Sequence, residues 1–261
     1  MSNSILFKNT KISFNQIGQG KPIILLHGFL SNSMMWNSLI PKISAKNCIV
    51  TIDLLGHGKS ECFGYIHTIE LMAEAVFSVL EHLNIKKATL IGHSMGGYVA
   101  LAFAELYPKM VQGLCLVNST SQEDSSERMQ LRSRAIEAVK TNYESIVRQS
   151  ISNLFRPKNR VLFSKEIKGL KKEALKTPIQ GYIAAQEGMK IRKNREVILH
   201  SGLFKKMMIM SKKDPVLNYD SLIKEVQNID IIIAKLPDGH MSYIENNEAF
   251  SYNIVHFIEN I

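Results

Sequence analysis

The chain has 261 residues, enough for one large α/β domain or one that carries an inserted subdomain, and its 45% hydrophobic and 21% charged residues exclude the disordered and fibrous classes. The net charge of +9 is concentrated in residues 119–200, which hold 17 Lys and Arg against 9 Asp and Glu. Because few aromatic side chains are interleaved with these basic ones, we interpret them as a solvated helical surface and expect no nucleic-acid partner.

Short apolar runs alternate with helical patterns over residues 1–118. Continuous apolar runs are typical of strands that are buried on both faces of a parallel sheet. The predicted elements, in chain order, are a hairpin of Ser4–Phe7 and Lys11–Gln16, strands at Pro22–Leu26, Cys48–Asp53, Ala88–Gly92 and Gly113–Asn118, and helices at Met35–Ala45, Ile69–Leu83 and Met95–Tyr107 between these strands.

The alternation stops at residues 119–204, where no strand is predicted. Apolar side chains recur there at three- or four-residue spacing, as in an amphipathic helix that Pro157 closes, namely Ile136, Val139, Tyr143, Val147 and Ile151. Two further helical stretches follow at Lys165–Leu175 and Tyr182–Met189. We therefore predict that residues 119–204 form a helical cap (a lid) inserted after the sixth strand.

Strand and helix alternate again over residues 205–261. Strands are predicted at Lys206–Met210 and Ile229–Leu236, and helices at Asp220–Val226 and Asn246–Ile258. Such alternation implies parallel strands with right-handed crossovers and helices on both faces. Residues 1–118 and 205–261 are therefore expected to form one α/β core.

The most specific motif is the Gly-x-Ser-x-Gly at residues 92–96, with Ser94 at its centre. It follows an apolar strand and precedes a helix, which is the context of a nucleophile elbow. The sharp turn forces the serine into a strained conformation, and side chains in place of Gly92 and Gly96 would collide with neighbouring turns. The motif therefore predicts a hydroxyl nucleophile presented at a helix N-terminus.

A neutral serine needs a base and a group that orients that base. In this motif the chain order is Ser, then acid, then His, which points to Asp214 and His240, each in a loop after a predicted strand. Asp238 is the rival acid, but it lies two residues from His240 and is interpreted as a residue that caps the loop. An acid after an earlier strand is excluded, because Asn118 occupies that place.

Two backbone amides are the candidates for an oxyanion hole. The N–H of Phe29 follows the Pro22–Leu26 strand, and the N–H of Met95 directly follows the nucleophile. His27 is interpreted as a structural residue that bonds loop backbone. The glycine-rich segment 53–60 lacks the spacing of a phosphate-binding loop, so its His57 is assigned to the scaffold.

These motifs, together with the His27-Gly28 and Gly239-His240 pairs and in this order, resemble the α/β-hydrolase superfamily. The resemblance covers Ile5–Asn118 and Lys205–Ile261, and it implies the α/β-hydrolase fold, with an eight-stranded, mostly parallel sheet flanked by helices. It also implies a catalytic triad of Ser94, Asp214 and His240 and an oxyanion hole of the Phe29 and Met95 amides. Serine at the elbow is unlike haloalkane dehalogenases and epoxide hydrolases, whose nucleophile is aspartate.

The function we expect is that of a serine esterase, a hydrolase that cleaves a small carboxylic ester through an acyl-enzyme and needs no cofactor or metal. Two alternatives stay open: a C–C bond hydrolase or elimination enzyme acting on an enol or diketo acid with the same triad, and a slow-turnover ligand receptor or partner-binding protein. Trp36 and Met129 are candidate pocket residues, and the basic cap could attract anionic substrates.

The expected setting of the protein follows from composition. Three cysteines are too few for a disulfide framework, which favours a reducing compartment. The first residues lack the pattern of a signal peptide, and no run approaches the roughly 20 apolar residues of a membrane span. We therefore expect a cytoplasmic protein with a small-molecule ester as its partner and no membrane association; no pattern indicates an oligomeric state.

Overall fold

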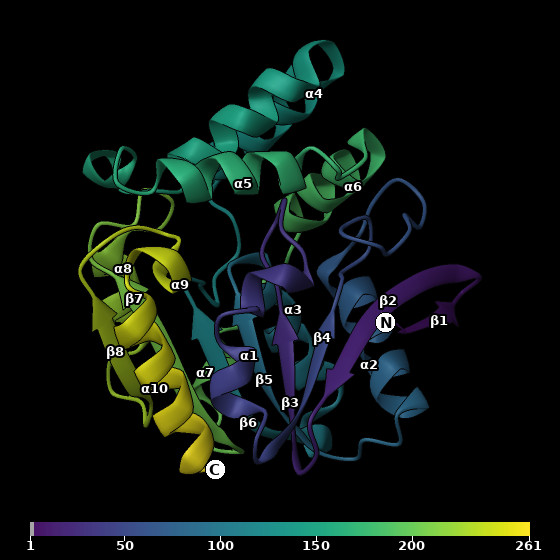
Figure 1. Cartoon of the computed structure of the whole chain (residues 1–261), viewed down its shortest axis with the longest axis vertical. Coiled ribbons are helices and arrows are strands. Elements are labelled where there is room, and N and C mark those ends of the chain that lie inside the picture. The colour runs from purple at the N-terminus through teal and green to yellow at the C-terminus, as the bar shows by residue number, and fades with distance from the viewer. Residues whose placement is uncertain (1–2) are drawn as a thin grey trace.

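The computed structural model describes residues 3–261, which form one eight-stranded sheet with helices on both faces (Figure 1). Only the β1–β2 and β2–β4 pairs are antiparallel, so the predicted, mostly parallel sheet is confirmed. In the order β1-β2-β4-β3-β5-β6-β7-β8, the strands are Asn3–Phe7, Thr10–Ile17, Asn47–Ile52, Lys21–Leu26, Ala88–His93, Val111–Val117, Lys205–Ser211 and Ile232–Leu236.

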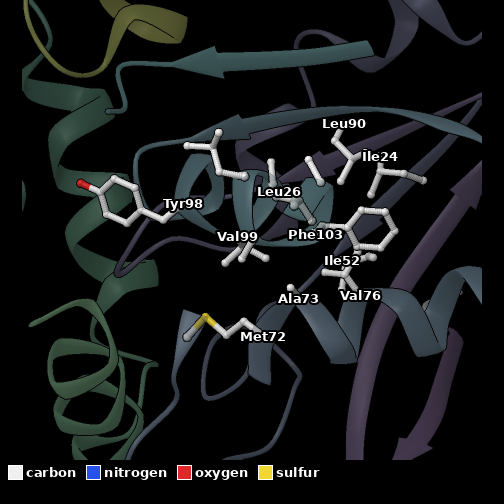
Figure 2. Packing of buried hydrophobic residues seen from close by; sticks show 14 of the residues in the cluster. Ile24, Leu26, Ile52, Met72, Ala73, Val76, Leu90, Tyr98, Val99 and Phe103 are labelled. Carbon is white, nitrogen blue, oxygen red and sulfur yellow. The ribbon is translucent and has the colours of Figure 1, made fainter. Parts of the chain in front are cut away.

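The central strands are buried on both faces, as their continuous apolar runs predict. Every residue of β4 and of β5 is buried. Alternate side chains of one strand enter opposite layers: Ile24 and Leu26 of β3 pack toward α2 and α3 (Figure 2), whereas Ile23 and Leu25 belong to the other apolar layer. The sheet is therefore held between two separate cores.

Helices α2 (Ile69–His82), α3 (Met95–Leu106) and α8 (Tyr219–Glu225) contribute to the first layer, and α1 (Ile40–Ile43) and α10 (Asn247–Glu259) to the second. A short helix α9 (Ser242–Glu245) precedes α10. The predicted continuous helix at Met35–Ala45 is wrong. A 3₁₀ turn at Ser33–Trp36 is followed by the single turn of α1. Pro41 lies in the first turn of α1, where proline is tolerated, whereas the interior of a longer helix would not tolerate it.

Four helices connect β6 to β7. The longest, α4 (Ser126–Asn153), is kinked at Asn142, where φ is −145° and ψ is 64°. It lies with α5 (Ser164–Ala174) and α6 (Ile179–Lys190) beyond the carboxyl ends of the parallel strands (Figure 1), whereas α7 (Glu196–His200) contacts α3. The three upper helices share a small apolar core that includes Val139, Val147, Ile151, Ala174 and Tyr182.

No helix within residues 3–261 combines the length and the apolar character that crossing a membrane requires. The three cysteines are free thiols; Cys48 and Cys115 are buried and Cys62 is partly buried. Burial raises the pKa of the Cys115 thiol well above its ordinary value, so this side chain packs as a small apolar group.

Candidate active site

Ser94 occupies the tight turn between β5 and α3. Its backbone has φ 50° and ψ −115°, outside the usual regions for a residue with a side chain, and its N–H donates to the Val117 carbonyl over 2.9 Å. A Cβ on Gly92 would overlap the backbone of Gly96. A Cβ on Gly96 would overlap the carbonyl group of Leu26, the last residue of β3, and lie 2.7 Å from the carbonyl oxygen of His27. The glycines therefore permit the contacts that hold Ser94 in this strained conformation.

His240 lies in the loop after β8 and Asp214 in the loop after β7. Their side chains meet: Nδ1 of His240 is 2.8 Å from Oδ2 of Asp214, and the two side chains are 2% and 0% exposed. Two backbone contacts hold the imidazole loop, because the His240 N–H donates to the Leu154 carbonyl over 3.0 Å and its own carbonyl is 3.0 Å from Nε2 of His93. The Asp214 contact favours the tautomer with the proton on Nδ1, which leaves Nε2 as an acceptor.

The carboxylate of Asp214 is fully supplied with hydrogen bonds. Oδ1 accepts from the backbone N–H groups of Val216 at 2.8 Å and Leu217 at 3.1 Å, and Oδ2 accepts from Asn118 at 3.0 Å in addition to His240. Burial disfavours the charged form, but the charge of His240 and these hydrogen bonds outweigh it and hold the pKa of Asp214 below its ordinary value. The group is therefore a carboxylate at neutral pH.

Asn118 positions this carboxylate, a role that sequence reasoning missed. It directly follows β6 and has a positive φ of 44°, and its Nδ2 donates to both Ser211 Oγ, at 2.8 Å, and Asp214. Its Oδ1 accepts from the Ser242 hydroxyl at 2.6 Å. The signal available was its place at the carboxyl end of the sixth strand, where the sequence excluded only an acid.

Ser94 and His240 line the same cavity, which has a volume of about 460 Å³ and lies under α4 and α6. The candidate oxyanion residue Phe29 also lines it. Within residues 3–261 neither the Phe29 nor the Met95 N–H donates a hydrogen bond. The cavity thus brings a hydroxyl and an imidazole together with Phe29 in its wall, and Met95 directly follows Ser94 in the chain.

The structure places the two candidate pocket residues away from this cavity. Trp36 is fully buried beside Phe250 in the second apolar layer, and Met129 is 36% exposed in a shallow groove on the outer surface of α4. The rival acid Asp238 forms an ion pair with Arg156 at 2.9 Å and accepts a hydrogen bond from Asn246, which agrees with a role in its own loop.

Two histidines near the site are structural in their contacts. Nε2 of His27 accepts from the Leu54 N–H at 2.9 Å, and its Nδ1 is 2.8 Å from the Gly28 carbonyl. His57 packs against the rings of His27 and Phe29. Burial lowers the pKa of both imidazoles, to about 3 at His57, so they are neutral parts of the scaffold.

Residues 21–246 match the family model of the α/β hydrolase fold. The chain belongs to the α/β-hydrolase family. Among curated relatives of this α/β-hydrolase, the uncharacterized hydrolase YugF of Bacillus subtilis is 36% identical over 99 residues, which are 38% of this chain and 36% of the relative. A serine hydrolase-like protein of Danio rerio is 38% identical over 105 residues, 38% of this chain and 31% of that protein. The matched stretches thus span about a third of these relatives.

Solved structures resemble this α/β-hydrolase over its whole length. A thermophilic esterase from Thermogutta terrifontis has a TM-score of 0.92 and 25% identity, covering 100% of this chain and 98% of that one. The enol-lactonase from Burkholderia xenovorans LB400 has a TM-score of 0.91 and 20% identity, covering 98% and 100%. A bromoperoxidase from Bacillus anthracis, at 15% identity, has a TM-score of 0.89. The fold is therefore shared across enzymes with different names.

The cavity of this α/β-hydrolase also contains polar side chains that sequence reasoning did not single out. Arg128 and Arg132 reach it from α4, and Gln186 from α6. The sequence showed that Arg128 and Arg132 are spaced to share one side of a helix, but it did not show which side of α4 faces the cavity. Within residues 3–261 no group of three or more His, Cys, Asp or Glu side chains is arranged to hold a metal ion.

Proposed function

We propose that this α/β-hydrolase is a serine hydrolase that cleaves a small carboxylic ester through a covalent acyl-enzyme. The observation that carries the proposal is the 2.8 Å contact between His240 and the Asp214 carboxylate, at the edge of the cavity that also holds the strained Ser94. A hydroxyl, an oriented imidazole and a buried carboxylate are the parts that acyl transfer needs. Membership of a hydrolase family supports the same reaction class.

In the first step, Ser94 Oγ attacks the ester carbonyl while Nε2 of His240 takes its proton. Asp214 holds the imidazole in the accepting tautomer and stabilises the imidazolium that forms. The negative charge that develops on the carbonyl oxygen is stabilised by the N–H groups of Phe29 and Met95, and each such donor typically contributes about 2.7–4 kcal/mol.

The tetrahedral intermediate collapses when His240 returns the proton to the leaving alcohol, which leaves an acyl group on Ser94. Water then attacks the acyl carbonyl, with His240 again as base, and releases the acid and the free hydroxyl. The same two amides stabilise the second oxyanion. The reaction balances without a cofactor, because water is the only co-reactant.

The helices between β6 and β7 suit the role of a cap, and we assign it to residues 119–204. Leu131 and Ile151 of α4, Leu170 of α5 and Met189 of α6 close the cavity over the end of the sheet. A volume of about 460 Å³ lies in the range of small-ligand sites, which supports a small acyl ester as the substrate class.

Replacement of the nucleophile tests the proposal. Ser94→Ala should abolish labelling by a fluorophosphonate and lower kcat on p-nitrophenyl acetate by several orders of magnitude, with an unchanged circular dichroism spectrum. Ser150→Ala is the matched control, since Ser150 lines the same cavity and should leave the fluorophosphonate adduct in place. Wild-type turnover by a folded Ser94→Ala protein would refute the proposed function.

A further inference from the structure

The charged lining of the active-site cavity is one-sided. Two arginines, Arg128 and Arg132, line it, and no Asp or Glu occurs among its described lining residues. The two lie four positions apart on α4, so their side chains leave the same side of that helix. The side chain of Asp214 is 0% exposed behind His240 and therefore does not face the cavity.

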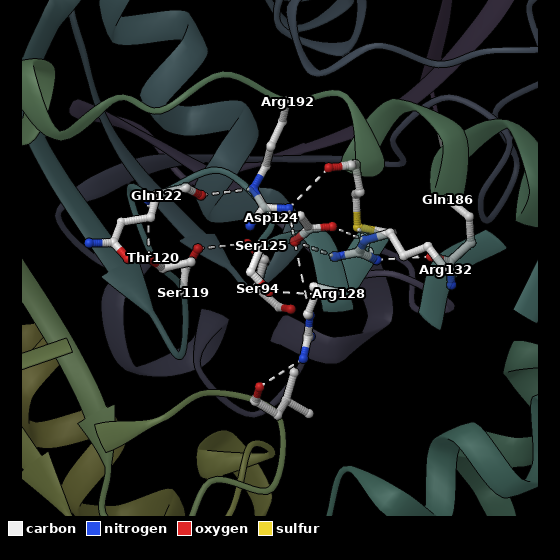
Figure 3. Close-up of polar contacts among 12 residues, drawn as sticks. Ser94, Ser119, Thr120, Gln122, Asp124, Ser125, Arg128, Arg132, Gln186 and Arg192 are labelled. Carbon is white, nitrogen blue, oxygen red and sulfur yellow. Dashed lines mark hydrogen bonds and ion pairs between the residues drawn. The ribbon is translucent and has the colours of Figure 1, made fainter. Parts of the chain in front are cut away.

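A single carboxylate serves three guanidinium groups at this end of α4. Asp124, just before the helix, is bound through Oδ2 by Arg132 and through Oδ1 by Arg192 at 2.5 Å (Figure 3). The third group, Arg128, remains 4.0 Å from Oδ1. Burial disfavours the Asp124 carboxylate, but the hydrogen bonds and charges of Arg132 and Arg192 hold its pKa below the ordinary value. With Arg128, the cluster therefore carries three positive charges and one negative charge.

Of the three arginines, Arg128 has the most hydrogen-bonding capacity left. Arg132 also donates hydrogen bonds to Oε1 of Gln186 at 2.8 Å and to the sulfur of Met189 at 3.5 Å. Within residues 3–261 the guanidinium of Arg128 forms a single hydrogen bond, to the Val216 carbonyl at 3.0 Å, and its side chain is 35% exposed. A guanidinium has five N–H donors, so most of those on Arg128 are free for a ligand.

The Val216 contact also places Arg128 across the cavity. Val216 belongs to the loop that carries Asp214, and its own N–H binds that carboxylate. Arg128 therefore extends from α4 to the loop of the candidate acid, in the cavity that Ser94 lines (Figure 3). A substrate that reaches Ser94 shares this small space with an incompletely neutralised cation.

We propose that Arg128 is a specificity-determining residue that binds a second, ionised carboxylate on the ester substrate. This inference rests on the proposed function and names its substrate class as anionic esters, such as half-esters of dicarboxylic acids or lactones that carry a carboxylate. Guanidinium and carboxylate match in geometry and form charge-assisted hydrogen bonds. Arg132 and Arg192 make the two short ion pairs with Asp124, and the one carboxylate cannot balance the charges of all three arginines.

The test compares esters that differ only in charge. Monoethyl succinate and ethyl levulinate are similar in size, but only the first carries a carboxylate beyond the ester. Wild type should have a higher kcat/KM for the half-ester, and Arg128→Met should lower the ratio of the two kcat/KM values by about tenfold or more, the loss expected for a hydrogen bond between charged groups. Arg128→Lys should retain part of the preference, because it keeps the charge but not the planar fork.

Arg134→Met is the matched control, since it removes the same charge from an exposed position of α4 in a surface groove outside the cavity. It should preserve the ratio. Equal kcat/KM values for the two esters in wild type, or an equal fall of the ratio in both variants, would overturn the inference.

A binding measurement separates this inference from the proposed function. Calorimetric titration of monoethyl succinate into the Ser94→Ala protein should show binding. The dissociation constant should be tenfold or more higher for the Ser94→Ala/Arg128→Met protein. If wild type does not turn over esters but binding still depends on Arg128, the hydrolase proposal alone is refuted. Ser94-dependent turnover of ethyl levulinate without any effect of Arg128 on half-ester binding or turnover would refute the anionic specificity alone.

Discussion

The substitution Asp214→Asn would remove the negative charge behind His240 and leave the size of the side chain nearly unchanged. If its oxygen faces the Val216 and Leu217 N–H groups, its NH₂ group meets His240 and the NH₂ of Asn118, two positions where Asp214 now accepts. In the reverse orientation the NH₂ group opposes two buried backbone donors, at a cost of about 1–3 kcal/mol for each. The first orientation is cheaper, since His240 can answer it by moving its proton to Nε2.

That tautomer cannot accept the proton of Ser94. We therefore expect Asp214→Asn to lower kcat on p-nitrophenyl acetate by about 10⁴-fold, or about 5 kcal/mol of activation free energy. The free energy of unfolding should fall by only about 1.5–3 kcal/mol, the value of one hydrogen bond to a charged group. Urea denaturation measures the second quantity and separates it from the first.

Asp238→Asn provides the comparison, because Asp238 is the neighbouring acid and pairs with Arg156 instead of His240. Its kcat should stay within about threefold of wild type, since no contact with the imidazole is lost. If Asp214→Asn kept kcat within tenfold of wild type, or if Asp238→Asn lost more activity than Asp214→Asn, the assignment of the acid would be incorrect.

Three further outcomes follow from the same contacts. Asn118→Asp should raise the kcat of Asp214→Asn at least about tenfold, because residue 118 lies 3.0 Å from the atom that bonds His240, and an unchanged kcat would contradict this placement. In urea titrations, Gly96→Ala should lower the free energy of unfolding by about 1–3 kcal/mol through overlap with β3, whereas Gly169→Ala, in open space on α5, should raise it by up to about 1 kcal/mol; equal effects would argue against the overlap. Burial lowers the pKa of four histidines, to about 3 at His57 and His93, about 4 at His67, and in the same direction at His27. Since the unfolded chain binds these protons near pH 6.5 and the folded chain does not, the free energy of unfolding should decrease as the pH falls below about 6.5, and a flat profile down to pH 4.5 would contradict their burial as neutral groups.

The elements that sequence predicted well are those with local causes. The strand Ala88–Gly92 ends within one residue of β5, because a continuous apolar run followed by Gly-x-Ser-x-Gly leaves few other conformations. The helix predicted at Met35–Ala45 is wrong, because an apolar helical pattern does not show where a helix breaks. The short turns on both sides of Asn37 are stabilised by burial against the sheet. Tertiary contacts replaced helix propensity there.

The candidate site divides in the same way. The chain order of the motif and the place of Asp214 and His240 in loops after two predicted strands pointed to this pair, and the structure brings their side chains together. Trp36 and Met129 were chosen by residue type, which says nothing about the direction of a side chain. Arg128 was one of 17 basic residues in its segment, and only the placement of α4 over the sheet distinguishes it from the exposed ones.

By itself the sequence determined the α/β core, the strained turn at Ser94 and the order of the acid and the histidine, because glycine sterics and apolar periodicity act between near neighbours. The tertiary structure alone decided that Asn118 hydrogen-bonds Asp214, and that three arginines share Asp124, of which Arg128 and Arg132 line the cavity. These contacts join residues far apart in the chain, and their geometry depends on how α4 and the loops after β6 and β7 pack together, which no local pattern encodes.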